Sequence, residues 1–297
     1  MIGQALNSVM SQTRAPDEII VIDQSDDERT ASVVAAFGGT QRRVRLIRVT
    51  VKGLSRAYNL ACASTTADVI AFTDDDCVAG SNWLEGIVQC FGDEPDVGLV
   101  YGQVLLPQSL HARENVDGVT PALPIPGRRR LSRHDGFKVF GMGANFAARR
   151  SMLLELGGFD EVLGGGGPLE SAQDFDLSYR AYRRGHVILL APEVVVYHFG
   201  FRSYVDWPRT IRSYGLGTGG FYCKYVRLGD AYATWLLGGV LIRQTLRAIR
   251  ATLLRRRAAR LDWSLLAHTV KGVRQSFGYP IDRRDMRYRL RLERATQ

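Results

Sequence analysis

The sequence is poor in cysteine and lacks the marks of a secreted or membrane-spanning chain. Four cysteines occur in 297 residues without Cys-x-x-Cys spacing, which argues against a disulfide framework and favours free thiols in a reducing compartment. The first residues show no basic segment followed by an apolar one, so we expect no secretory signal. The uncharged apolar run 231–242 is shorter than the roughly 20 residues that span a bilayer.

Lysine is scarce, and the charge is unevenly distributed. Only four of the 39 basic residues are lysine, a preference that points to a GC-rich bacterial genome. Residues 1–200 carry 19 basic and 24 acidic side chains, a net charge of −5, whereas residues 201–297 carry 20 and 6, a net charge of +14. We therefore expect two regions, 1–200 and 201–297, with different roles.

Apolar runs alternate with helical patterns through the first hundred residues. Because strands separated by helices form right-handed βαβ units, the pattern predicts an α/β domain with a mostly parallel sheet. Acidic clusters follow two of the strands, at the sheet edge where ligands bind in such folds. The predicted strands are 18–23, 44–49, 69–73 and 97–106. Residues 106–138 form an irregular excursion, and from about residue 200 the strand signals stop and the pattern is helical and basic.

Three consecutive carboxylates, Asp74, Asp75 and Asp76, follow the predicted strand 69–73. At a strand end Asp74 and Asp76 point to one side and Asp75 to the other. Two oxygen ligands on one side suit Mg²⁺ or Mn²⁺. The alternative is a solvated acidic turn, which the apolar strand leading directly into the motif makes less favourable.

Asp174 lies near the start of a predicted helix and follows the glycine run 164–167. A carboxylate at this position caps a helix N-terminus. It is also suited to act as a general base that takes a proton from a hydroxyl nucleophile. The pattern alone leaves both roles open. For Asp176, a structural role as partner of Arg180 is the favoured interpretation.

Several motifs in this order resemble family 2 glycosyltransferases, including rhamnosyltransferase-like members. The resemblance covers residues 5–220 and rests on EIIVIDQSDD, GLSRAYNLA, AFTDDDCV, GANFAARRSMLLELGGFDE, QDFDLSYR and VVVYHFG. It implies a GT-A (Rossmann-like) fold, a nucleotide-diphospho-sugar donor, a divalent metal (Mg²⁺ or Mn²⁺) and inversion at the anomeric carbon.

The resemblance assigns donor and metal contacts to individual positions. Asp23 matches the residue that contacts the nucleobase, and Gln24 replaces a frequent second aspartate. Asp76 matches the metal ligand, and Asp74 the residue directed to the ribose or the metal waters. We also expect Asp75, which lies between them in the motif, to contact the donor.

Further positions match donor and sugar contacts. Tyr58 stands where the family commonly has arginine before asparagine, so Lys52 or Arg56 is expected to contact the diphosphate. Gly143 and Asn145 match the segment that lines the donor sugar and the acceptor.

Asp174 matches the family's proposed catalytic base, with Gln173 in place of the usual glutamate. The resemblance also suggests that His198 reaches the pyrophosphate or the metal, although a lone histidine at a strand end is more often structural. The segment 209–220 is glycine-rich and basic; it resembles a phosphate-covering segment, with a flexible connection between helices as the alternative.

The family normally opens with an apolar strand and a nucleotide-cupping loop that precede the first residues of this chain. We expect the DNA upstream of the Met1 codon to encode such a strand in frame. Stop codons immediately upstream would exclude this.

The sequence thus predicts an inverting glycosyltransferase of cell-envelope polysaccharide or glycolipid synthesis with a glycan or lipid-linked acceptor. Its basic helical region would rest on an anionic membrane, which places the enzyme in the cytoplasm on the inner face of the cell membrane.

One alternative is a GT-A module that binds without catalysis. A nucleic-acid binder using the basic region is disfavoured, because the basic residues alternate with apolar rather than stacking aromatic residues. The oligomeric state, the donor base and the sugar are not predicted.

Overall fold

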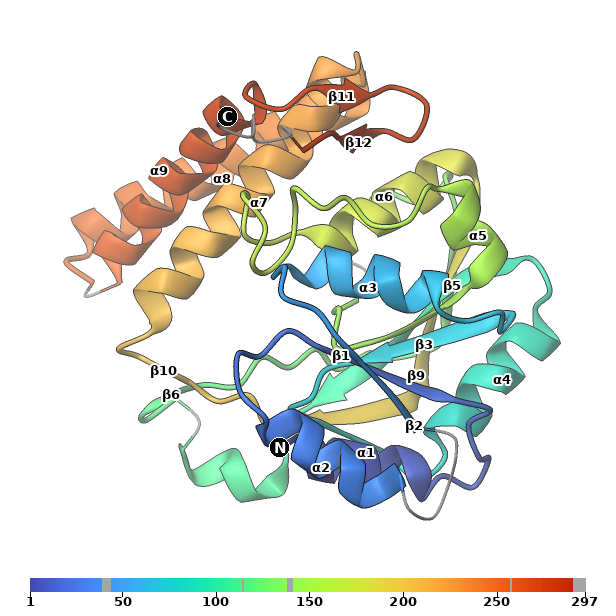
Figure 1. Cartoon of the computed structure of the whole chain (residues 1–297). Coiled ribbons are helices and arrows are strands. Elements are labelled where there is room, and N and C mark those ends of the chain that lie inside the picture. Colours follow the sequence, from blue (N-terminus) through green and yellow to red (C-terminus); the bar gives the residue numbers. More distant parts are fainter. Residues whose placement is uncertain (39–43, 114, 138–140, 257, 291–297) are drawn as a thin grey trace, which may run out of the picture. The chain divides into compact units, whose positions relative to one another are not determined.

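The computed structural model describes residues 1–297 except 39–43, 114, 138–140, 257 and 291–297. The predicted alternation of strands and helices is present (Figure 1). The helices are α1 (Ile2–Met10), α2 (Arg29–Gly38), α3 (Leu54–Ala63), α4 (Trp83–Asp93), the 3₁₀ helix η1 (Gln108–Arg113), α5 (Arg150–Glu155), α6 (Gln173–Arg184), α7 (Trp207–Arg227), α8 (Ala231–Leu253) and α9 (Ala259–Ser276). The strands are β1 (Ile19–Asp23), β2 (Val44–Arg48), β3 (Val69–Thr73), β4 (Cys77–Ala79), β5 (Val97–Leu105), β6 (Gly118–Val119), β7 (Arg129–Leu131), β8 (Asn145–Arg149), β9 (Val187–His198), β10 (Arg202–Ser203), β11 (Ile281–Asp282) and β12 (Arg287–Tyr288).

The strands form one large sheet and three small ones. The six-stranded sheet has the order β3-β8-β5-β9-β4, and β7 also pairs with β9. β1 and β2 form a separate parallel pair. In the large sheet β5 and β9 are parallel, whereas β8 runs antiparallel to β3 and β5, and β4 and β7 run antiparallel to β9. The α/β class is as predicted. The large sheet is mixed and not mostly parallel, because in the described residues its one parallel pair is β5 with β9.

The chain divides into two compact units. The first unit comprises residues 1–52, 57–158 and 177–203, and the second comprises 53–56, 159–176 and 204–297. The main division after residue 203 lies close to the predicted boundary after residue 200. The second unit also takes in 53–56 and 159–176, which the sequence prediction assigns to the first region.

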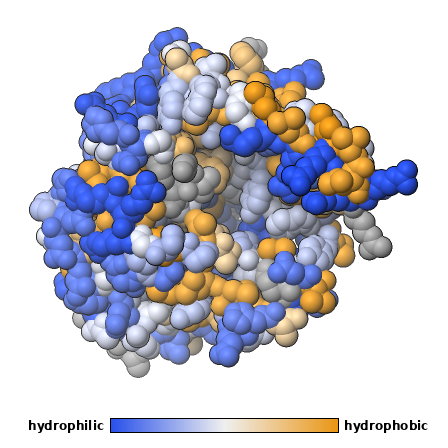
Figure 2. Space-filling model, turned by 180° about the vertical axis from the view of Figure 1, so that it is seen from behind, coloured by the Kyte–Doolittle hydropathy of each residue, from blue (hydrophilic) through white to orange (hydrophobic). Residues whose placement is uncertain are grey.

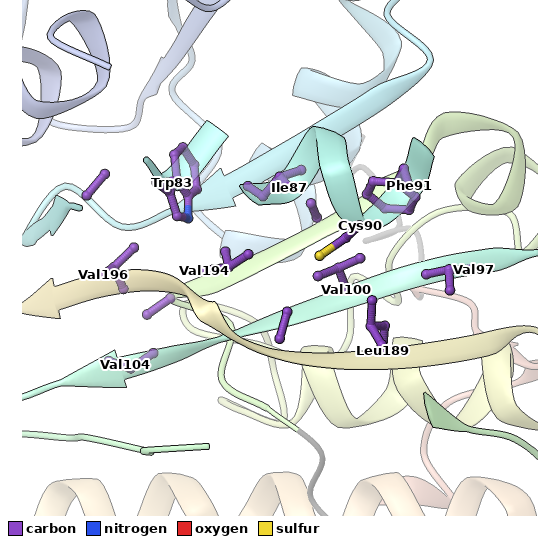
Figure 3. Close-up of a cluster of buried hydrophobic side chains, with 14 of the residues drawn as sticks. Trp83, Ile87, Cys90, Phe91, Val97, Val100, Val104, Leu189, Val194 and Val196 are labelled. Atoms are coloured by element: carbon purple, nitrogen blue, oxygen red, sulfur yellow. The ribbon is translucent and has the colours of Figure 1, made fainter. Parts of the chain in front are cut away.

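The core of the first unit lies between α4 and the large sheet. Figure 3 shows the α4 side chains directed onto β5 and β9. Trp83, Ile87 and Cys90 recur at helical spacing, which gives α4 one apolar face. The residues labelled on the strands are Val97, Val100, Val104, Leu189, Val194 and Val196. This packing fixes the strands whose ends carry the candidate site.

The second unit is built around α7, α8 and α9, which pack against one another. Gly229 adopts a positive φ of 84° directly after α7, and the Asp230 carboxylate accepts hydrogen bonds from the N–H groups of Tyr232 and Ala233 at 3.0 and 3.1 Å. A glycine in the left-handed region and an aspartate N-cap are strong stop and start signals. They explain why α7 and α8 are separate helices.

Short strands occur where the sequence predicts none. β11 and β12 form a hairpin in the second unit, and β10 pairs with β6 in the first. The irregular stretch 106–138 contains η1, β6 and β7. Two- and three-residue strands carry too few residues to show an alternating pattern. In the part of the chain described, no helix is both long enough and apolar enough to cross a membrane.

Candidate functional site

A turn and a strand pair hold the acidic motif that follows β3. The N–H of Cys77 donates to the carbonyl of Asp74 at 3.1 Å. β4 then runs antiparallel to the end of β9, with Cys77 opposite His198. The N–H of Phe199 donates to the carbonyl of Asp76 at 2.8 Å. This pairing delivers a histidine to the acidic motif.

The side chains of the motif gather into a compact group of ligand atoms. Ligand atoms of Asp74, Asp76, Cys77 and His198 all lie within 4.8 Å of one another. Nε2 of His198 is 3.6 Å from Oδ1 of Asp76. Asp75 is exposed, whereas Asp74 and Asp76 are half-buried. Asp75 is thus separated from the other two carboxylates, as predicted, but a turn after β3 and not strand alternation separates it.

The surroundings of His198 suit a metal ligand. Burial lowers the pKa of His198, although the charge of Asp76 opposes the shift, so the imidazole is neutral near pH 7 and keeps a lone pair for a cation. Its Nδ1 is buried without a hydrogen-bond partner among the described residues. A Cβ at Gly200 would collide with the carboxylate of Asp76 and the ring of His198. The glycine thus leaves space beside both groups.

The donor set matches a hard divalent cation. Burial raises the pKa of the Cys77 thiol, and the charges of Asp74 and Asp76 raise it further, so the thiol is protonated and a poor ligand. Two carboxylates and one imidazole remain, a set suited to Mn²⁺ or Mg²⁺. Sequence reasoning missed the position of Cys77 within this group, although its adjacency to Asp76 was visible.

Asp23 ends β1 with a buried carboxylate. Its Oδ1 accepts hydrogen bonds from the N–H and Oγ of Ser25 at 2.9 and 2.6 Å. Its Oδ2 lies 3.6 Å from Nε of Arg48 and accepts no hydrogen bond from the described residues. This oxygen therefore has unused hydrogen-bonding capacity beside its ion pair with Arg48.

The candidate phosphate-binding cations are each paired with a carboxylate. Nζ of Lys52 lies 2.5 Å from Oδ2 of Asp26, and both side chains are exposed. In the second unit, Nε of Arg56 lies 3.2 Å from Oε2 of Glu161. These pairs would have to open or rearrange before either cation met a phosphate.

Tyr58 belongs to the core of the first unit. Its ring makes edge contacts with Phe72 and Phe146, with centroids 5.0 and 5.9 Å apart. Its hydroxyl lies 3.5 Å from the carbonyl of Gly143. A buried aromatic ring at this position fills volume, so it does not replace the charge of an arginine.

Asn145 is completely buried at the start of β8. Its Nδ2 donates to the carbonyls of Gln103 and Val194, both at 2.9 Å, and its Oδ1 accepts from Nε1 of Trp83 at 2.8 Å. These bonds join β5, β9 and α4 around one amide. The half-buried Gly143 lies two residues earlier. Contact between these two residues and the donor stays a prediction.

Asp174 occupies the first turn of α6 and belongs to the second unit. Its half-buried carboxylate accepts a hydrogen bond from the N–H of Phe175 at 3.0 Å. The preceding loop is conformationally unusual, because Glu170 and Ala172 adopt positive φ values of 61° and 73°. Non-glycine residues in this region are strained, and such strain gathers at functional sites.

The glycine-rich segment 209–220 is neither a loop nor a flexible connection. It lies within the 21-residue helix α7, and its glycines are buried. A Cβ at Gly219 would collide with the carbonyl of Thr269 in α9, and one at Gly217 would collide with Ser171. The glycines therefore permit close packing against α9 and the 159–176 segment, and helical backbone leaves their N–H groups unavailable for phosphates.

Sequence comparison reveals a family match over just over half of the chain. Residues 1–157 match the family described as "Glycosyl transferase family 2". The chain is 26% identical over 209 residues to the glucosyl-dolichyl phosphate glucuronosyltransferase of Haloferax volcanii, covering 69% of this chain and 67% of that protein. It is 29% identical over 205 residues to the O-antigen chain rhamnosyltransferase RfbN of Salmonella typhimurium, covering 65% of this chain and 60% of the relative.

Comparison of structures places the chain among proteins with the GT-A fold. The mannosyltransferase PcManGT from Pyrobaculum calidifontis, solved with GDP-Man and Mn²⁺, has a TM-score of 0.60 at 17% identity, covering 93% of this chain and 83% of that one. S. aureus TarS 1–349, solved with UDP, has a TM-score of 0.53 at 16% identity, covering 93% and 86%. At these identities the likeness concerns the fold alone.

Proposed function

The chain belongs to glycosyl transferase family 2, and from this membership we propose that it transfers a sugar from a nucleotide-diphospho-sugar to an acceptor hydroxyl with inversion. The observation that carries the proposal is the group of Asp74, Asp76 and His198 ligand atoms at the end of β3. Two carboxylates beside a neutral imidazole suit a cation that accompanies a diphosphate. PcManGT, of similar fold, was solved with GDP-Man and Mn²⁺.

Asp74, Asp76 and His198 would hold Mg²⁺ or Mn²⁺. When bound, the cation supplies positive charge that stabilises the departing nucleoside diphosphate. Asp75, exposed next to this group, is proposed to contact the donor. The pairing of β4 with β9 fixes these residues before the donor arrives, which lowers the ordering cost of binding.

The remaining donor contacts are proposed residue by residue. Asp23 would accept an N–H of the nucleobase, because its buried Oδ2 has no hydrogen bond from the described residues. Lys52 or Arg56 would contact the diphosphate after leaving its present carboxylate partner. Gly143 and Asn145 would line the sugar through their segment of chain.

Asp174 is proposed as the general base. Its carboxylate would take the proton of the acceptor hydroxyl as that oxygen forms a bond to the anomeric carbon. The bond from the anomeric carbon to the diphosphate oxygen breaks on the opposite face, and the electron pair leaves with the nucleoside diphosphate. Attack from the opposite face inverts the anomeric configuration.

The basic helices of the second unit are proposed to rest on an anionic membrane. α8 contains no acidic residue, and its exposed large apolar side chains recur at spacings of seven, four, three and four residues, which places them on one face. We call this set the α8 stripe: Trp235, Ile242, Leu246, Ile249 and Leu253. Hydrophobic side chains beside strongly hydrophilic ones are visible at the upper right of Figure 2, where α8 lies.

Arginines accompany the α8 stripe, as an anionic surface requires. Arg243 and Arg250 lie on α8, and Arg255 and Arg256 follow it, all exposed. The relatives named above act on a dolichyl phosphate compound and on an O-antigen chain. We therefore propose a cell-envelope glycan or lipid-linked acceptor, and a peripheral location on the cytoplasmic face of the bacterial cell membrane.

A panel of nucleoside diphosphates and their sugars, with and without Mn²⁺, tests the proposal by thermal shift. At least one donor should raise the melting temperature only when Mn²⁺ is present, and that donor then serves in a transfer assay.

Asp174→Asn should reduce turnover by at least about a hundredfold and leave the Mn²⁺-dependent shift intact. Asp117→Asn, an exposed carboxylate elsewhere, is the matched control.

A non-catalytic GT-A module is the second candidate, favoured by Gln24, Tyr58 and Gln173 at positions where the family usually has other residues. It predicts donor binding without metal-dependent donor hydrolysis, and no change on Asp174→Asn. A flat thermal response to every donor would count against both candidates.

A further inference from the structure

A buried group of three charged side chains lies in the second unit, apart from the residues assigned above. Nζ of Lys224 on α7 lies 2.6 Å from Oδ2 of Asp160 and 2.5 Å from Oδ1 of Asp176. All three side chains have no exposed surface. We call these three residues the Lys224 cluster.

Neighbouring groups complete the hydrogen bonding of the Lys224 cluster. The hydroxyl of Tyr225 donates to Oδ1 of Asp176 at 2.7 Å. The N–H of Tyr288 donates to Oδ2 of Asp160 at 2.8 Å, and the N–H of Val162 donates to its Oδ1 at 3.1 Å. The ammonium of Lys224 also lies 5.2 and 5.3 Å from the ring centroids of Tyr225 and Tyr288. Ion pairs, hydrogen bonds and aromatic rings thus surround the three buried charges.

Stability alone does not account for such a cluster. Moving charges from water into a protein interior costs several kcal/mol for each ion, and well-packed apolar residues often stabilise a core equally well. Two carboxylates and one ammonium also leave a formal charge of −1. A buried arrangement of this kind fixes one geometry, because breaking any member leaves an unpaired charge.

The Lys224 cluster fixes the geometry of the segment 159–176, which carries Asp174. Asp160 stands at the start of the 159–176 segment and Asp176 at its end, and both are tied to the same lysine of α7. Between them the chain passes through the strained residues Glu170 and Ala172. Strained backbone persists only where its surroundings determine it strongly.

A second set of contacts ties the middle of the segment to the start of α7. Nη2 of Arg212 lies 2.6 Å from Oε1 of Glu170. The Oγ of Ser213 donates to the carbonyl of Glu170 at 3.0 Å, and the Oγ of Ser171 donates to the carbonyl of Ser213 at 2.8 Å. α7 thus holds the segment at its ends and in its middle.

We propose that Lys224 is a positioning residue for Asp174. Asp174 and Asp176 are two residues apart in the first turn of α6, so their side chains leave the helix in different directions. Anchoring Asp176 to Lys224 fixes the rotation of that turn, and with it the direction of the Asp174 carboxylate. The proposal rests on the role of Asp174 as general base.

The test uses the full chain and a soluble acceptor analogue. Lys224→Met should lower kcat by about ten- to a hundredfold, because small displacements of a reacting group are costly. The donor KM should change by less than about threefold, because the side chain of Lys224 has no exposed surface with which to meet a donor. Tyr225→Phe removes one hydrogen bond of the cluster and should lower kcat about two- to tenfold. Arg289→Met breaks a surface pair with Asp282 in the same unit and should change neither parameter.

Hydrogen exchange provides a readout that does not depend on turnover. Amides of residues 163–176 should exchange faster in Lys224→Met than in wild type, and at the wild-type rate in Arg289→Met. Titration of the active sites with donor counts the folded molecules. It therefore distinguishes a loss of folded protein from a lower kcat of each folded molecule. If Lys224→Met does not fold, Tyr225→Phe supplies the same comparison.

The outcomes separate failure of the proposal from failure of its premise. If Asp174→Asn abolishes turnover but Tyr225→Phe and Lys224→Met keep wild-type kcat and wild-type exchange, the positioning role is wrong. If Asp174→Asn keeps full turnover, the assignment of the base is wrong and the positioning role fails with it. A kcat loss shared equally by Arg289→Met would also overturn the proposal.

Discussion

Nε2 of His198 lies 3.6 Å from Oδ1 of Asp76 because β9 and β4 pair in a register that sets Cys77 opposite His198. A shift of this register by one residue would turn the imidazole to the other face of the sheet. The proposed metal-ligand group is therefore a product of strand pairing, and the proposal expects His198 to contribute to cation affinity.

Replacing His198 by alanine should weaken Mn²⁺ binding at least about tenfold, because one of three ligands is lost. Asp76→Asn should weaken it more, since a charged oxygen donor is removed. Titration of Mn²⁺ followed by electron paramagnetic resonance, with nucleoside diphosphate present, measures both. Tyr197→Phe, which alters the neighbouring strand residue, should bind as wild type. Unchanged affinity in His198→Ala would contradict the assignment.

The burial of His198 makes the stability of the metal-free chain pH-dependent. Burial lowers the pKa of His198 in the folded state, whereas an unfolded imidazole titrates at about pH 6.5. Below that pH the imidazole of His198 binds a proton in the unfolded chain but stays neutral in the folded chain. The free energy of unfolding should therefore fall as pH decreases from about 7 toward the lowered pKa of the folded state.

Urea unfolding in the presence of a chelator measures this pH dependence. His198→Asn should lose less unfolding free energy than wild type over the same pH decrease. His111→Asn, an exposed histidine in η1, is the control and should follow wild type. Parallel curves for wild type and His198→Asn would show that the buried imidazole does not carry the effect.

Glycines in α7 and α8 should respond oppositely to alanine. A Cβ at Gly219 would collide with a main-chain carbonyl of α9, whereas a Cβ at Gly238 would meet no atom within 4 Å. Gly219→Ala should therefore lower the free energy of unfolding by about 1–3 kcal/mol. Gly238→Ala should raise it by about 0.5–1 kcal/mol, because alanine favours helix over coil. Both are measured by chemical denaturation, and destabilisation of equal size in both would refute close packing of α7 on α9.

The α8 stripe should mediate binding to anionic vesicles. Leu246→Asp places a negative charge on the stripe and should reduce co-sedimentation with phosphatidylglycerol vesicles at least about tenfold. Val205→Asp, at a valine with 88% exposure outside α8, should bind like wild type. Binding by wild type should also fall with added salt.

Two results would contradict a membrane role of the stripe. One is equal binding to neutral and anionic vesicles, since the arginines would then contribute nothing. The other is a concentration-dependent dimer that Leu246→Asp abolishes without any effect on vesicle binding.

The sequence by itself determined the features that depend on near neighbours. The strand 69–73 and the first three strand–helix alternations follow from local periodicity. Family motifs are also local, so the family membership was readable before any fold was known.

Tertiary structure alone decided which distant residues meet. Antiparallel pairing brings His198 to Asp76, and the packing of α7 brings Lys224 to Asp160 and Asp176. Spacing along one helix predicts Arg180 as a partner of Asp176, which stays a prediction, whereas it contains no information about Lys224 on another helix. Glycines of the 209–220 segment had the composition of a phosphate-binding loop, yet contact with α9 makes them helical packing residues. Burial and strand register, which no local pattern contains, assign these roles.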